Sequence, residues 1–161
     1  MAVSGGYTIN HAAALAGMVA DGQLCNTVSK LNKSTTVEIP WGSGVVADGE
    51  DGAKLPVSAS TAAQFKGVVK YELNRAHTSN SGGAIPQYDM TLVTVGTIWV
   101  RVLDTVAADA PVYLRVGATD AGDFSGIAGT GATAGVLIPN AKFLSGGDAG
   151  DLVKISLVVG G

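Results

Sequence analysis

Residues 91–103 read TLVTVGTIWVRVL, and this stretch decides the fold class. In its second half the even-numbered residues Ile98, Val100 and Val102 share one face of an extended chain, and the odd-numbered residues share the other. Strict alternation of this kind is typical of a β-strand with one face in the core. Gly96 lies in the middle of the stretch, and a glycine there indicates a bend or bulge that splits the segment into two strands or curves it.

Other short segments with strand character lie on both sides of this stretch and are separated by turns rich in Gly, Asp and Ser. No strand–helix–strand pattern joins them, so a parallel sheet with crossover helices is not expected. The sequence therefore predicts an all-β protein, a single compact sandwich or barrel of about eight short strands. The other expected strands are residues 35–39, 44–47, 65–72, 111–116, 140–144 and 152–159.

The N-terminal residues do not follow this β pattern. Asn10 could cap a short apolar helix over residues 11–20, but Gly17 and the Asp21-Gly22 pair would end it quickly. A short helix and an extended arm are both compatible with these residues. We therefore expect residues 1–31 to form an N-terminal arm and residues 32–161 to form the β domain.

Charge is scarce along the chain. Charged residues make up 14% of the 161 residues, and 10 Lys and Arg against 13 Asp and Glu give a net charge of −3, whereas about 25% charged residues is usual. The acidic isoelectric point, about 5.1, argues against a phosphate-binding surface as the main function. The single cysteine, Cys25, excludes a disulfide framework and a cysteine-based zinc site. The low charge indicates an exterior that another protein covers, and the alternative is a robust lone domain with an Ala- and Gly-rich surface.

Motifs that would support catalysis or cofactor binding are absent from the sequence or out of context. Two G-x-G-x-x-A matches, at residues 42–47 and 129–134, are not followed by the helix that a dinucleotide site requires. His11 and His77 are far apart, and neither has a second histidine at metal-ligand spacing. The acidic residues cluster in turns beside glycines. We expect no enzymatic activity, no metal and no cofactor.

The longest apolar run, residues 12–20, has about half the length needed to cross a bilayer. The residues before it contain no Lys or Arg, so the positive region of a secretory signal is missing. We therefore expect no membrane partner and production in a cytoplasm.

Several segments occur in an order that is informative as a series, although each is short. They are Ile39-Pro-Trp-Gly42, Phe65-Lys-Gly-Val-Val69, Val95-Gly-Thr-Ile-Trp-Val-Arg-Val102, Ala110-Pro-Val-Tyr-Leu-Arg115 and Ile138-Pro-Asn-Ala-Lys-Phe-Leu144. This succession resembles the capsid decoration, or structural cement, proteins of tailed bacteriophages. The resemblance extends from about residue 16 to the end of the chain.

The resemblance implies a β-rich protein on the outer face of the virion capsid, bound after the head expands. There it would hold neighbouring major capsid protein subunits together against the pressure of packaged DNA. Its partners would be the major capsid protein and further copies of itself, as a homotrimer or a dimer, and not nucleic acid. The alternative function is a phage head fibre or a receptor- or carbohydrate-binding β domain, which would present Tyr7, Tyr88 or Phe124 in a groove.

The arm and two tryptophans provide the candidate interface residues. We expect residues 2–31 to lie on the capsid or to exchange with a neighbouring protomer, because small residues such as Gly17 permit close approach of two backbones. Large aromatic side chains are common anchors of interfaces, although the core is the favoured place for the tryptophan at position 99. The candidates for capsid or protomer contact are Tyr7, Ala12, Leu15, Met18, Trp41 and Trp99.

Overall fold

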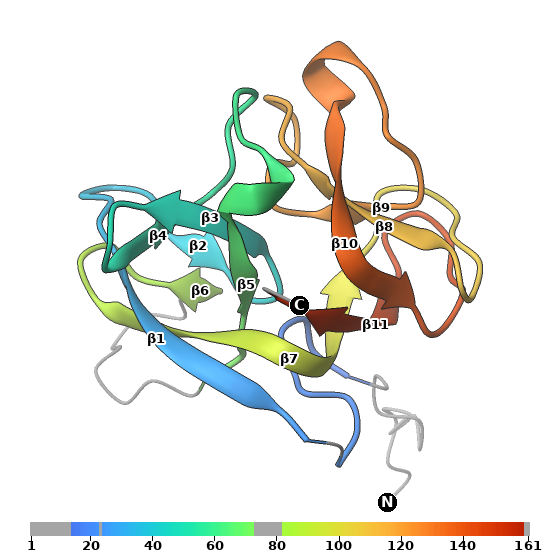
Figure 1. The fold of residues 1–161 in the computed structure, drawn as a ribbon, viewed down its shortest axis with the longest axis horizontal. Helices are drawn as coiled ribbons and strands as arrows, with labels where there is room; N and C mark the ends of the chain where they lie inside the picture. Colours follow the sequence, from blue (N-terminus) through green and yellow to red (C-terminus); the bar gives the residue numbers. More distant parts are fainter. Residues whose placement is uncertain (1–13, 23, 73–81, 160–161) are drawn as a thin grey trace, which may run out of the picture.

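The alternating segment identified in the sequence is the central strand of the fold. A computed structural model of the chain describes residues 14–22, 24–72 and 82–159, and Figure 1 shows their arrangement. The central strand is β7 (Asp89–Arg101), whose even-numbered residues Ile98 and Val100 are fully buried. The other strands are β1 (Asn26–Asn32), β2 (Ile39–Pro40), β3 (Gly44–Asp48), β4 (Gly52–Lys54), β5 (Phe65–Val69), β6 (Gly83–Ala84), β8 (Pro111–Arg115), β9 (Phe124–Ser125), β10 (Gly135–Phe143) and β11 (Leu152–Val158).

Nearly all of these strands belong to one sheet, in the order β1-β4-β3-β5-β7-β11-β10-β8-β9. β1 also pairs with β7, so the first five strands of this order close into a barrel. At the other end of the sheet β9 returns to the end of β7, where the Leu103 amide donates to the Phe124 carbonyl over 3.0 Å. β2 and β6 form a separate two-stranded ribbon. The all-β fold class is therefore confirmed, and barrel closure leaves few open edges.

β7 is one continuous strand that serves both halves of the sheet. Its first half pairs with β1 and β5, and its second half pairs with β11 from Val95 to Arg101. Gly96 has a φ of +132°, and a Cβ at this position would lie 3.3 Å from the Cα of Cys25. Figure 1 shows β7 curving along its length, as the central glycine predicts.

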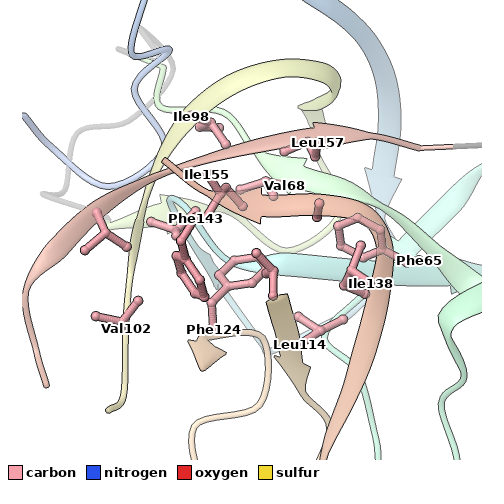
Figure 2. Packing of buried hydrophobic residues seen from close by; sticks show 14 of the residues in the cluster. Phe65, Val68, Ile98, Val102, Leu114, Phe124, Ile138, Phe143, Ile155 and Leu157 are labelled. Atoms are coloured by element: carbon pink, nitrogen blue, oxygen red, sulfur yellow. The ribbon is translucent and has the colours of Figure 1, made fainter. Parts of the chain in front are cut away.

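Adjacent residues of the sheet point into two hydrophobic clusters. Val68 and Val93 are paired across β5 and β7 and belong to the larger cluster, whereas their neighbours Val69 and Leu92 belong to the smaller one. Neighbouring residues enter different clusters because side chains alternate between the two faces of each strand. Figure 2 shows the larger cluster, where Phe124 and other side chains from β5, β7, β8, β10 and β11 meet.

The observed strands depart from the expected ones at several places, and the expected strand at residues 65–72 ends at Val69. The sequence analysis placed no strand before residue 35, but β1 occupies residues 26–32, so the predicted end of the arm at residue 31 falls inside this strand. Of the expected strand at residues 35–39, only Ile39 is in a strand, because residues 32–37 form a turn held by the Asn32 and Ser34 side chains. The strand expected at residues 140–144 begins earlier, at Gly135.

The helical content of the described residues is two single 3₁₀ turns, η1 (Ala62–Gln64) and η2 (Gly131–Thr133). Among these residues no helix has the length and apolar character needed to span a membrane.

Candidate interaction surface

The described part of the predicted arm runs along the edge of β7. The Gly17 amide donates to the Trp99 carbonyl over 2.8 Å, and the Trp99 amide donates to the Met18 carbonyl over 2.9 Å. Further along, the Ala20 amide donates to the Thr97 carbonyl, and Val19 forms an antiparallel bridge with Ile98. β1 then continues in the same direction beside the first half of β7. Residues 17–20 and β1 therefore pair along β7, and the residues just before them form a turn in which the Met18 amide donates to the Leu15 carbonyl over 3.1 Å.

At Gly17 this segment packs directly against the backbone of Gly42, Val69 and Tyr71. The carbonyl of Gly17 accepts a hydrogen bond of 2.7 Å from the Tyr71 amide, and the φ of this residue is +82°. A Cβ at this position would lie 2.7 Å from the Tyr71 nitrogen and 2.8 Å from the Gly42 nitrogen, distances that real Cβ atoms do not reach. Only glycine fits both the backbone angle and the space.

Four apolar side chains of this segment are exposed. Leu15 is 49% exposed, Met18 39%, Leu24 81% and Val28 39%. We call these four residues the N-terminal strip. Residues 1–20 contain no Asp, Glu, Lys or Arg. The first charged residue of the segment, Asp21, lies between Met18 and Leu24 in the chain, with its Oδ1 3.8 Å from the Lys154 Nζ. Exposed apolar side chains on a segment with little charge are typical of a surface that another protein covers.

The two tryptophans lie beside this segment and outside the fully buried core. Trp41 is half-buried and meets Tyr71 edge to face, with 6.0 Å between ring centroids. Trp99 is also half-buried, and the Nζ of Lys154 lies 5.6 Å from its ring centroid. The sequence analysis favoured the core for Trp99, but its side chain is on the odd-numbered face of β7, opposite the buried Ile98.

The structure thus brings together four of the six candidate interface residues. Leu15 and Met18 are joined by a contact between the Leu15 amide and the Met18 sulfur at 3.3 Å, and Gly17 between them meets both Gly42 and the backbone of Trp99. Trp41 precedes Gly42 in the chain. Tyr7 and Ala12 lie outside the described residues.

Two members of the strip, Leu24 and Val28, were not among the residues that the sequence analysis singled out. Val28 lies in β1, whose sequence NTVSKLN is mostly polar, and its residues 26–29 are all exposed. A strand exposed on both faces has no alternation between apolar and polar positions. Its sequence therefore does not predict it, and it is recognised only from its pairing with β7.

A small pocket of about 260 Å³ opens beside Trp41, and Ala16, Arg101, Asp120 and Asp123 contribute to its lining. Burial raises the pKa of Asp123, the nearby Arg101 opposes this rise, and the like charge of Asp120 adds to it. Two acids beside one arginine form a polar pocket, not a recognisable catalytic arrangement. Among the described residues, no three His, Cys, Asp or Glu side chains gather as a metal site would require.

Two of the three aromatic residues proposed for the receptor-binding alternative lie in the described part of the chain. Phe124 is fully buried in the larger cluster, whereas Tyr88 is 53% exposed in the bend just before β7. The third residue, Tyr7, lies outside the described part of the chain.

Comparison with known proteins identifies the family. The sequence matches the family described as "Structural cement protein (E217 gp24/Pam3 gp6)" over residues 3–158. No curated protein matches it. Among solved structures, a chain in "The capsid of Myoviridae Phage XM1" has a similar fold, with a TM-score of 0.66 at 20% identity, covering 98% of each chain. Because the family match spans nearly the whole sequence, the chain belongs to the phage structural cement protein family.

Proposed function

We propose that this protein binds the outer surface of the expanded head of a tailed phage and stabilises contacts between major capsid protein subunits. The family match over residues 3–158 carries this proposal. The N-terminal strip supports it, because a cement protein acts by burying apolar surface and needs no reacting group. On this proposal the protein works by binding alone, without catalysis, and its partners include neither nucleic acid nor a membrane.

The N-terminal strip is the surface that we propose faces the capsid. Met18 and Val28 lie where the backbone is hydrogen-bonded to β7, and Leu15 and Leu24 lie close to these anchored stretches in the chain, so little conformational freedom remains to be lost on binding. Stable protein interfaces bury about 1,600 Å² in total. The strip would form the apolar centre of such an interface, with Trp41 and Trp99 beside it.

We also propose that the protein self-associates, as a homotrimer at three-fold or quasi-three-fold positions or as a dimer at two-fold positions. Linked copies would bind the capsid lattice at several equivalent points, and such multivalency strengthens attachment without any new contact. Sedimentation equilibrium of the free protein distinguishes these states by mass. A monomer at all concentrations would contradict self-association while leaving capsid binding untouched.

The binding proposal is tested with expanded heads that lack the decoration protein. Purified protein is mixed with the heads at increasing concentration, the heads are sedimented, and the retained protein is measured. We expect saturable retention at one copy per capsid subunit or a simple fraction of that number. Unexpanded heads serve as the control, with weaker retention expected. Retention that does not saturate, or no retention at all, would contradict the proposal.

A further inference from the structure

The side chain of Met18 lies at the surface over a tight turn of the N-terminal segment. The Met18 amide donates to the Leu15 carbonyl over 3.1 Å, and the Leu15 amide lies 3.3 Å from the Met18 Sδ. The Met18 carbonyl also accepts a hydrogen bond from the Trp99 amide, which fixes the backbone to β7. The side chain is 39% exposed. A small reagent in solution can therefore reach it, and its sulfur has a defined neighbour.

Met18 differs in this respect from the other methionine in the described part of the chain. Met90 is 2% exposed and belongs to the smaller cluster. The third methionine of the sequence, Met1, lies outside the described residues. Thioethers react with peroxides according to their accessibility, and the thioether is the group of an apolar side chain that they oxidise. In the folded protein Met18 should therefore be oxidised under conditions that leave Met90 intact.

Hydrogen peroxide converts a methionine thioether into a sulfoxide. A lone pair of the sulfur attacks one peroxide oxygen, so that an S–O bond forms while the O–O bond breaks. The hydroxide that leaves takes the proton of the transferred oxygen and becomes water. The sulfur loses two electrons, and the peroxide gains them. The product is a polar side chain with a hydrogen-bond acceptor where an apolar side chain stood.

The turn at Leu15 and Met18 has no room for the new oxygen between the sulfur and the amide. A hydrogen bond from an amide nitrogen to an oxygen takes about 2.7–3.2 Å by itself, whereas the whole distance from the Leu15 nitrogen to the Met18 Sδ is 3.3 Å. The oxygen must therefore point away from this amide or push the turn apart. The first change places an unpaired acceptor on the N-terminal strip, and the second displaces Leu15. Both changes oppose burial of the strip against an apolar partner surface.

We propose that Met18 is an oxidation site and that its sulfoxide weakens attachment of the protein to the head. This inference rests on the proposed contact between the N-terminal strip and the capsid. Bound protein would be protected, because the capsid would cover the side chain. Sulfoxide reductases return methionine sulfoxide to methionine, so that the loss of attachment is reversible.

Treatment with peroxide before the head-binding assay tests this proposal. A Cys25→Ala variant, which lacks the competing thiol, is incubated with dilute hydrogen peroxide, and catalase removes the peroxide before expanded heads are added. We expect peptide mass spectrometry to find one added oxygen at Met18 and none at Met90. The affinity for heads should fall by about tenfold, equivalent to about 1.4 kcal/mol. Incubation of the oxidised protein with methionine sulfoxide reductases should restore retention.

Two further variants in the same background show whether the position of the thioether matters. Met18→Leu cannot form the sulfoxide, so its own retention should be the same before and after peroxide. Adding Leu144→Met to Met18→Leu moves the thioether to a site outside the strip, since Leu144 is 43% exposed. Its oxidation should also leave retention unchanged.

A loss of retention in Met18→Leu, or a sulfoxide at Met18 that leaves retention unchanged, would overturn the proposal. Oxidation of Met90 as fast as that of Met18 would also overturn it. If the untreated protein is not retained by heads at all, the proposed function itself fails, and this inference fails with it. Retention of the untreated sample therefore separates the two failures.

Discussion

Gly17 shows how a single residue fixes the N-terminal segment to the β domain. Gly17→Ala should destabilise the protein by about 1–3 kcal/mol, because alanine disfavours the positive φ and its Cβ would overlap the Tyr71 and Gly42 backbone. Urea unfolding measures this difference. Gly22→Ala is the control, since a Cβ there has no neighbour within 4 Å, and its effect should stay within about 0.5 kcal/mol. Equal effects of the two substitutions would contradict the close backbone packing at Gly17.

Asp123 should make stability depend on pH in an unusual direction for an acid. Burial raises its pKa above the ordinary value of 3.8, so the folded state binds a proton more tightly than the unfolded state. The stabilising contribution is therefore present at low pH and is lost as the pH rises through the folded pKa. Asp123→Asn removes this group. Relative to the unchanged protein, the variant should gain thermal stability between acidic and neutral pH, and a difference in Tm that is constant with pH would contradict this account.

Phe124 is fully buried in the larger cluster, and its backbone pairs with Leu114 of β8 and forms a bridge with Val102, the residue after β7. Phe124→Ala should reduce the free energy of unfolding by about 3–5 kcal/mol through lost burial and the cavity left behind. Chemical denaturation measures the loss. Ile127→Ala, at a nearby site that is 61% exposed, should change it by less than about 0.5 kcal/mol. A small effect at position 124 would show that the cluster is packed differently.

At the scale of elements, the strands that the sequence predicts are those with contrast between their two faces. β7 alternates clearly in its second half, and β8 and β11 were predicted within a residue of their observed bounds. β1 was missed because its first four residues are exposed on both faces and its stability comes from pairing with β7. The start of β10 was missed because it follows a low-complexity run of Gly, Ala and Thr. Pairing with distant strands, not local pattern, decides such elements.

The N-terminal strip gives a prediction for capsid binding at the same scale. Met18→Asp places a charge in the centre of the proposed interface, where desolvation of an unpaired carboxylate is costly. Its affinity for expanded heads should fall by about tenfold or more, equivalent to at least about 1.4 kcal/mol. Leu144→Asp is the matched control, because Leu144 and Met18 are 43% and 39% exposed and Leu144 lies outside the strip. Equal retention of both variants in the sedimentation assay would place the capsid contact elsewhere.

At the scale of the whole molecule, scarcity of charge indicated a covered exterior but not which face is covered. The sequence analysis named Leu15, Met18, Trp41 and Trp99, and the fold places them around the point where Gly17 packs against Gly42. It did not name Leu24 or Val28, whose exposure follows from the path of the segment along β7. A groove lined by η1, β5, β10 and β11 could not be predicted from the sequence either, because residues from four separate elements form it.

The central claim is that this protein strengthens the head. It is tested most directly by heating DNA-filled expanded heads, with and without saturating protein, and recording the temperature at which DNA becomes accessible to an external dye. The account predicts that bound protein raises this release temperature and that the increase saturates with occupancy of the head. Bound protein that leaves the release temperature unchanged would contradict the claim.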